Sequence, residues 1–321
     1  MRSFAFAVMA LFAGGCAPAA SPHAGAVPTG PMFDFHTDPW VNLHQHIAAE
    51  AGLGWWRGKA PTCACARAPD GTVLAEWGAA VAGYETTLKG RDPTFDDGLQ
   101  QTNLALAVVG EKAALPGEGV DPNVARLLAP LFPGYLQRGW PDDLAKDREW
   151  ITAVTPLVAR WGDGIATELA MRLDATWPLL PVRVEVSRLA GSHGAYTSTS
   201  PILTTMSSED AGYQGEAALE MLFHEASHGI SGNLEHDLDL AFIAEGKSAP
   251  RDLYHAIIFY SAGELVRRRL GPSYVPYAYK QGVYKRGEWP RLEVAMREQW
   301  QPWLLGQTDL RSTLVALAKA L

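Results

Sequence analysis

The chain has 321 residues, of which 47% are hydrophobic and 19% are charged, so its composition is that of an ordinary globular protein. This length fits one large domain or two closely packed ones. A formal net charge of −8 and an isoelectric point near 5.6 argue against a nucleic-acid partner, which would require a basic face.

The first residues have the pattern of an export signal. Residues 1–15 combine one arginine, an apolar core from Phe4 to Ala13 and then small residues, and we leave them out of the fold. The sequence FAGGC, which ends at Cys16, resembles the lipobox of bacterial lipoproteins, although Ala13 stands where leucine is commonest. The resemblance implies that Cys16 is lipidated and begins the mature chain. We therefore expect an exported protein, lipid-anchored in the bacterial envelope, either periplasmic or at the outer membrane.

A flexible tether is expected between this anchor and the fold. Residues 16–32 are rich in alanine, proline, glycine and serine, and ordered structure is predicted to begin near Phe33. No later run approaches the roughly 18 apolar residues that a membrane-spanning helix needs. The lipid is therefore the only membrane attachment that we predict, and residues 33–321 are expected to form the folded domain.

The domain begins with a mainly helical part that extends to about residue 177. Four runs repeat apolar residues at spacings of three and four, with glycine and proline between them: 75–88, 95–110, 121–132 and 147–177. We interpret these runs as a helical scaffold around the functional site.

Two pairs of potential metal ligands in this part are interpreted as structural. The run 43–52 looks helical, which places His44 and His46 about 200° apart, so ordinary surface or cleft histidines are favoured over a second metal site. Cys63 and Cys65 are two positions apart, where a disulfide is strained, and the local sequence lacks further ligands. We favour a loop pair without a catalytic role.

Strands are predicted after residue 177. Residues 181–189 alternate with period two and are rich in β-branched side chains, and residues 195–208 follow a turn-like AGSHG. Pro201 fits an edge strand better than a central one. Metallopeptidases of the HExxH type place a sheet edge beside the active-site helix, where an extended substrate adds as a strand. A purely structural hairpin is equally compatible with this sequence.

The sequence GEAALEMLFHEASHG contains the motif HExxH on a predicted helix, with Ser207 or Ser208 as its expected cap. With 3.6 residues per turn, His224 and His228 lie one above the other and reach a single ion. Glu225 is rotated by about 100° and addresses a water molecule bound to that ion. The motif therefore predicts the site of a zinc hydrolase.

A catalytic zinc site normally has three protein ligands, so one more is expected downstream. The candidates are His236, Glu245, His255 and Glu264. His236 does not fit the metzincin pattern HExxHxxGxxH, because the glycine comes one residue late and the histidine two residues late. Glu245 resembles the ligand of some gluzincins, but that group usually adds an acid four residues on, where this chain has Ala249.

We choose His255 as the third ligand and keep Glu245 as the alternative. His255 lies in LYHAIIFYSAG, which is apolar almost all round and predicts a buried helix. A buried histidine needs a polar partner, and a metal ion would provide one, although a backbone carbonyl is the common competing partner. Glu264 lies about 180° away around this helix and is expected to pair with Arg268.

The remaining part of the domain, residues 272–321, follows the strands and metal-site helices of 178–271. Its sequence predicts two helices separated near residues 306–308. Its tryptophans Trp289, Trp300 and Trp303 are expected to pack the fold rather than to contact a ligand.

The stretch HEASH followed by LYHAIIFYSAGE resembles a family of uncharacterised exported bacterial proteins, over roughly the C-terminal third of the chain. The resemblance implies a zincin-like peptidase fold and names no substrate. We therefore predict an α+β, predominantly helical protein with a small β-sheet beside the HExxH helix.

The predicted activity is hydrolysis of peptide or protein substrates with one Zn²⁺ ion held by His224, His228 and His255. Glu225 is expected to take a proton from the zinc-bound water and to deliver it to the leaving amine. A nearby histidine or tyrosine is expected to stabilise the oxyanion, and the tyrosine candidates are Tyr260, Tyr277, Tyr279 and Tyr284. The alternative is a noncatalytic envelope lipoprotein that retains the fold and binds zinc or a partner. A third interpretation makes the motif accidental in a helical protein.

Overall fold

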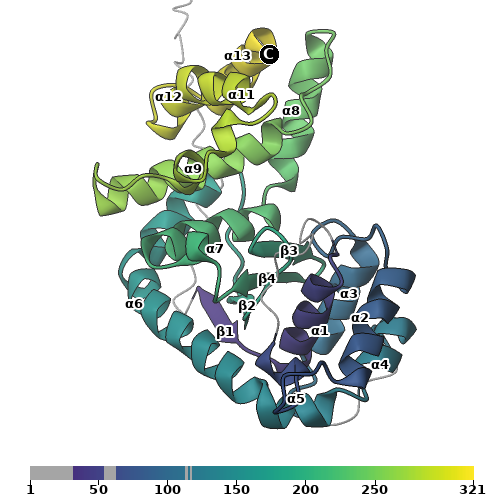
Figure 1. Cartoon of the computed structure of the whole chain (residues 1–321). Helices are drawn as coiled ribbons and strands as arrows, with labels where there is room; N and C mark the ends of the chain where they lie inside the picture. The colour runs from purple at the N-terminus through teal and green to yellow at the C-terminus, as the bar shows by residue number, and fades with distance from the viewer. Residues whose placement is uncertain (1–31, 54–62, 113–114, 116–117) are drawn as a thin grey trace, which may run out of the picture.

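The computed structural model describes residues 32–53, 63–112, 115 and 118–321 (Figure 1). The predicted signal, Cys16 and nearly all of the predicted tether lie outside these ranges. The described chain is α+β and predominantly helical, with one small sheet, as predicted. None of the described helices is both long and apolar enough to cross a bilayer.

The sheet has four strands in the order β1-β2-β4-β3. Their bounds are β1 (Phe33–His36), β2 (Val182–Ser187), β3 (Ala195–Thr199) and β4 (Ile202–Ser207). Strands β1, β2 and β4 are parallel, whereas β3 and β4 form an antiparallel hairpin. The run predicted as one strand is thus two strands, and Pro201 lies in the turn between them instead of in an edge strand. The sequence did not predict β1, whose Phe33 pairs with the distant Val182.

The predicted helical scaffold is present on one face of the sheet. Its helices are α1 (Pro39–Glu50), α2 (Ala75–Thr87), α3 (Asp97–Leu106), α4 (Pro122–Leu128) and α5 (Phe132–Arg138). They share a hydrophobic core that also includes Leu203 of β4. Within this core Trp40 stacks on Phe132 with ring centroids 3.5 Å apart. The N-terminal helices therefore pack beside the sheet, to its right and lower right in Figure 1.

His44 and His46 lie on α1 and point to different neighbours, as helical spacing predicts. His44 Nδ1 lies 2.9 Å from the Tyr84 hydroxyl, and His46 Nε2 lies 2.8 Å from Asp143 Oδ2. Both histidines are fully buried, not at the surface or in a cleft as we expected. Each has a polar partner, and neither belongs to a metal-binding group among the described residues.

Cys63 and Cys65 are joined by a disulfide, despite their spacing. The bridge spans the short 3-10 helix η1 (Ala64–Ala66), and both cysteines are buried against the core of the N-terminal helices. Neither cysteine belongs to a metal-binding group among the described residues.

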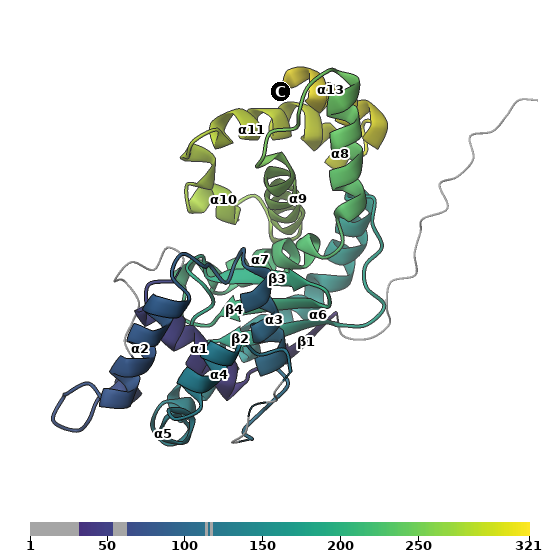
Figure 2. The same ribbon diagram turned by 90° about the vertical axis from the view of Figure 1, so that its right-hand side faces the viewer.

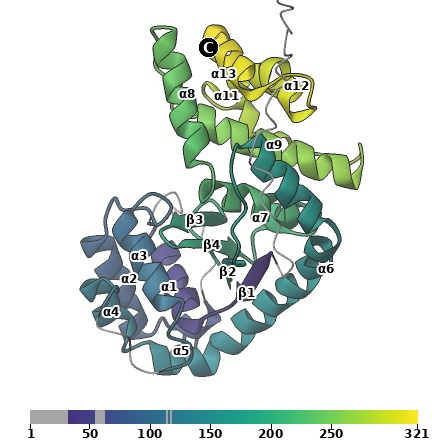
Figure 3. The same cartoon turned by 180° about the vertical axis from the view of Figure 1, so that it is seen from behind.

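Helix α6 (Trp140–Arg172) has 33 residues and connects the N-terminal helices with the rest of the molecule. It packs against α5 at one end and against α7 (Glu216–His228) and α9 (Leu253–Leu270) further along (Figure 3). The remaining helices are α8 (Gly232–Ala244), α10 (Tyr277–Lys280), α11 (Trp289–Ala295), α12 (Gln301–Leu304) and α13 (Leu310–Ala320). Figure 2 shows α7 on the sheet, α9 above it, and α10 and α11 to one side.

The segment before α7 differs from the prediction. Ser207 does not cap α7, because its hydroxyl accepts hydrogen bonds from the backbone N–H groups of Glu209 and Asp210. A short 3-10 helix, η2 (Ala211–Tyr213), follows, and α7 begins after Gly215, whose φ of 57° is in the region that favours glycine. The start of α7 is therefore determined by the turn at Gly215, and the helix is stabilised by the burial of its apolar face.

Glu185 lies in β2 and is fully buried between the sheet and the N-terminal helices. Its Oε2 accepts a hydrogen bond from Arg183 Nη2 at 3.0 Å, while its Oε1 has no partner within the described chain. Burial raises the pKa of Glu185 to about 8, even though Arg183 favours the ionised form. The carboxyl group is therefore held mostly neutral at pH 7.

We expect Glu185→Gln to make the folding stability less sensitive to pH. Since the folded pKa of Glu185 lies above its ordinary value of 4.5, this group contributes stability that is lost as pH rises from about 5 to about 8. Glutamine keeps the shape and does not ionise. Urea denaturation across this pH range should show that the free energy of unfolding falls by about 1–3 kcal/mol less in the variant than in the wild-type chain. Equal losses in the two proteins would contradict the raised pKa.

Candidate metal centre

Three histidines meet between α7 and α9. His224 and His228 lie one turn apart on α7, and α9 brings His255 to the same face. The ring centroids are 5.2 Å apart for His224 and His228, and 5.1 Å apart for each pair that includes His255. Each histidine offers a ring nitrogen, and these nitrogens all lie within 4.8 Å of one another. The three side chains are therefore close enough to bind one metal ion.

The spacing of these nitrogens suits a tetrahedral ion. His224 Nε2 and His255 Nε2 are 3.2 Å apart. Two nitrogens at about 2.0–2.1 Å from one zinc ion in tetrahedral geometry are roughly 3.3 Å apart. An all-imidazole donor set suits zinc and is unlike the oxygen ligands that calcium and magnesium prefer. Three ligands also leave a fourth position for water or substrate.

The local electrostatics keep all three imidazoles neutral, which is the form that binds a metal. Burial lowers the pKa of His228 to about 3 and that of His255 to about 4. Burial also holds the pKa of His224 well below its usual value, and the neighbouring His255 and His228 lower it further. The site thus needs no proton release from these rings at neutral pH before it binds a cation.

Aromatic side chains hold the histidine rings in place. Phe259, one turn after His255 on α9, stacks on His224 with centroids 3.8 Å apart and an interplanar angle of 27°. Trp289 at the start of α11 lies edge-on to His255 at 5.7 Å. His224 Nδ1 is buried without a hydrogen-bond partner among the described residues, so its ring is oriented by stacking on Phe259.

Glu225 lies beside the histidines and is also buried. Its Oε2 accepts a hydrogen bond of 2.9 Å from the Thr197 hydroxyl, which also lies 3.1 Å from the Glu225 carbonyl oxygen. Burial raises the pKa of Glu225 to about 7, and the bond from Thr197 opposes that shift. Thr197 belongs to β3, the strand at one edge of the sheet, so the predicted sheet edge does lie beside the HExxH helix.

Tyr277 is brought to the site by a buried acid of α7. Glu220, one turn before His224, accepts hydrogen bonds from the Tyr277 backbone N–H at 2.9 Å and from the Tyr274 hydroxyl at 2.6 Å. The Tyr277 ring then stacks on Phe259 with centroids 6.1 Å apart. Burial raises the pKa of Tyr277, and a hydrogen bond with the neighbouring Tyr213 opposes this rise.

The other tyrosine candidates are engaged elsewhere. The Tyr260 hydroxyl donates to Gln301 Oε1 at 3.2 Å, and the Tyr279 hydroxyl donates to Glu293 Oε1 at 2.7 Å. Tyr284 is buried and packs near Trp289. Among the four predicted candidates, Tyr277 is the one whose ring stacks on Phe259, which itself stacks on His224.

The competing ligand candidates lie outside the histidine group. His236 and Glu245 are both exposed, on α8 and at its C-terminal end. Glu264 forms an ion pair with Arg267 instead of the predicted Arg268, which pairs with Glu168. The structure thus gathers His255 with the HExxH histidines and leaves Glu245 apart.

Several residues around the site were not identified from the sequence. Thr197 sits in a predicted strand, and its period-two position beside the HExxH helix was the available signal. Phe259 follows His255 at helical spacing, which was the signal for a shared face. Trp289 was expected only to pack the fold, yet it contacts His255, and its position depends on a chain reversal that local sequence does not encode.

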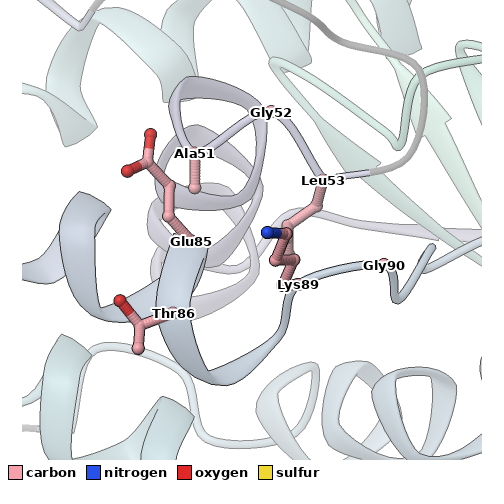
Figure 4. Close-up of a pocket in the computed structure, with 7 residues that line it drawn as sticks. All are labelled: Ala51, Gly52, Leu53, Glu85, Thr86, Lys89 and Gly90. Carbon is pink, nitrogen blue, oxygen red and sulfur yellow. The ribbon is translucent and has the colours of Figure 1, made fainter.

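A separate pocket lies among the N-terminal helices, between the end of α1 and the end of α2 (Figure 4). Its lining residues are Ala51, Gly52, Leu53, Glu85, Thr86, Lys89 and Gly90. The lining contains one acid and one base but no histidine, so it offers no constellation comparable with the group on α7 and α9.

Comparison of the chain with protein-family models, with curated proteins and with solved structures finds no match. The case for its function therefore depends on the side chains of this centre. What the described chain presents is a three-histidine group that suits a metal ion, with Glu225 beside it.

Proposed function

We propose that this protein is a zinc-dependent hydrolase, and specifically a peptidase of the zincin type. The observation that carries this proposal is the meeting of His255 with the two histidines of the HExxH helix around one point. Three neutral imidazoles and an adjacent buried carboxylate are the groups that a catalytic zinc site requires. The accidental interpretation of the motif has no comparable reason for this convergence.

Each residue of the proposed site has a separate role in hydrolysis. His224, His228 and His255 would hold a zinc ion, which would supply a water molecule of lowered pKa and a Lewis acid for the substrate carbonyl. The Glu225 carboxylate would accept a proton from the attacking water and pass it to the leaving amine, and its pKa of about 7 suits a group that does both near neutral pH. Thr197 holds the carboxylate, and Tyr277 is the proposed donor to the developing oxyanion.

The proposed substrate is an extended peptide or unfolded protein segment. Among the described strands β3 pairs with β4 alone, so one edge of its backbone has no strand partner. A peptide that adds to this edge would gain main-chain hydrogen bonds and would pass beside Glu225, which Thr197 of the same strand contacts. Placement of the enzyme in the bacterial envelope, through a lipid on Cys16, is part of the same proposal.

The proposal is tested with the purified mature chain. We expect about one zinc ion per chain, hydrolysis of unfolded-protein or peptide substrates, loss of activity with a chelator such as dipicolinate, and recovery when zinc is added back. A chain without stoichiometric zinc contradicts the site. A chain that holds zinc but never turns over a peptide would instead support a noncatalytic zinc-binding envelope protein.

We expect Thr197→Val to lower kcat by about tenfold or more without loss of zinc. Valine has nearly the same shape as threonine but removes the hydroxyl that donates to Glu225, and a hydrogen bond to a charged group contributes about 1.5–3 kcal/mol. Thr197→Ser is the matched control, because it keeps the donor and should keep most of the activity. Equal activity in both variants would show that Thr197 does not position Glu225.

A further inference from the structure

Two leucines stand exposed in the loop between α6 and β2. Leu179 and Leu180 are 74% and 79% exposed, the two highest fractions among the large hydrophobic residues of the described chain. Pro178 and Pro181 flank them and restrict the backbone on both sides. The neighbouring Trp177 is buried against Phe33 and fixes the base of the loop to the core. The two leucines are therefore held out from a rigid support.

This loop lies where the N-terminal segment enters the fold. The backbone N–H of Val182 donates to the carbonyl oxygen of Met32 at 2.9 Å, and β1 and β2 then pair from Phe33 and Val182 onward. Leu180 is two residues from Val182, so it lies close to the first described residue of the chain. The predicted lipid on Cys16 is only 16 positions before Met32.

We propose that Leu179 and Leu180 contact the surface of the lipid bilayer in which the acyl chains on Cys16 are anchored. This inference rests on the proposed lipid anchor and is independent of the hydrolysis. As the tether that its composition predicts, the segment of 16 residues would span about 20–24 Å on average, so an anchor would keep this face of the domain near the membrane. Exposed leucines gain free energy when they enter the interfacial region.

A bilayer fits this loop better than a protein partner does. A stable protein interface buries about 800 Å² on each side, and two leucine side chains supply only a small part of that area. A membrane needs no complementary shape, and the lipid anchor supplies most of the affinity, so a small apolar contact is enough to orient the domain.

The contact would place β1 nearer to the membrane than β3. Strand β1, beside the loop, is at one edge of the sheet, and β3, beside Glu225, is at the other. Three strand spacings of about 4.8 Å separate these edges. The edge strand that is proposed to bind substrate then faces the aqueous compartment.

A site-specific fluorophore tests this orientation in the lipidated full chain. Leu180→Cys adds one reactive thiol, because Cys63 and Cys65 are joined to each other and Cys16 carries the lipid in this proposal. Phe95→Cys is the matched control, since Phe95 is 73% exposed. Its ring lies near that of His193, and His193 belongs to the loop that leads into β3. Both variants are labelled and placed in phosphatidylcholine vesicles that contain a spin-labelled lipid.

We expect quenching at position 180 to be at least about twofold stronger than at position 95. Equal quenching at the two positions overturns the proposal, as does a mass that shows no lipid on the purified chain. In the absence of vesicles, the label at position 180 could instead be shielded from solvent in a protein of twice the monomer mass. That result would identify a second copy of the chain as the partner and would also overturn the proposal. Hydrolysis of a soluble peptide is measured separately, so failure of this contact and failure of the proposed activity are distinguishable.

Discussion

Replacement of Glu225 by glutamine is expected to lower kcat by about 10²- to 10⁴-fold and to leave the zinc content unchanged. The amide has nearly the same shape as the carboxylate, but it does not accept a proton from water. Glu225 is not a member of the three-histidine group, so the substitution leaves all three candidate ligands in place. Peptide hydrolysis and metal content should be measured on the same preparation.

Glu216→Gln is the matched control, because Glu216 lies in the first turn of the same helix and is exposed. It should keep wild-type activity. Undiminished hydrolysis by the Glu225 variant would remove this residue from the mechanism. Loss of zinc together with activity would show that Glu225 maintains the structure of the site instead of acting on the substrate.

His255→Ala is expected to remove zinc from the purified chain. Substitution of a residue that only hydrogen-bonds to a zinc ligand typically lowers metal affinity by roughly 10- to 100-fold. Loss of one of the three ligands themselves should lower it by more. Activity should fall with it. Titration of the metal-free variant with zinc, followed by a competing chelator, measures the change.

Two control variants separate His255 from the alternatives. Glu245→Ala and His236→Ala alter exposed residues of α8 and its end, and both should bind zinc as the wild-type chain does. If Glu245→Ala releases zinc while His255→Ala retains it, Glu245 is the third ligand. Thermal unfolding of the metal-free proteins shows whether the variants remain folded, because Ile257 and Ile258 beside His255 belong to the main core.

The parts of the site that sequence reasoning located are those with local signals. The HExxH spacing placed His224 and His228 on one face of a helix, and α7 has that form. The choice of His255 followed from an apolar helix that left a histidine in need of a partner, and α9 is buried along most of its length. Their roles as zinc ligands and the zincin-like assignment remain predictions.

The parts that sequence reasoning missed depend on contacts between distant segments. Strand β1 has four residues, which is too short for a period to be recognised, and its partner is β2. The long run after the AGSHG turn was predicted as one strand because its β-branched residues conceal the reversal at Pro201. Trp289 reaches His255 only after the chain has passed through α10 and turned back.

The origin of the three histidines has a consequence for the energetics of the whole chain. Two come from α7, while the third comes from α9 after the chain has gone out and back through α8. An ion bound by all three joins these segments in the native state alone, so by mass action it stabilises the fold by RT ln(1 + [L]/Kd), about 2.7 kcal/mol at a hundredfold excess over Kd. Free zinc in the surrounding compartment would thus set the resistance of this protein to unfolding and proteolysis.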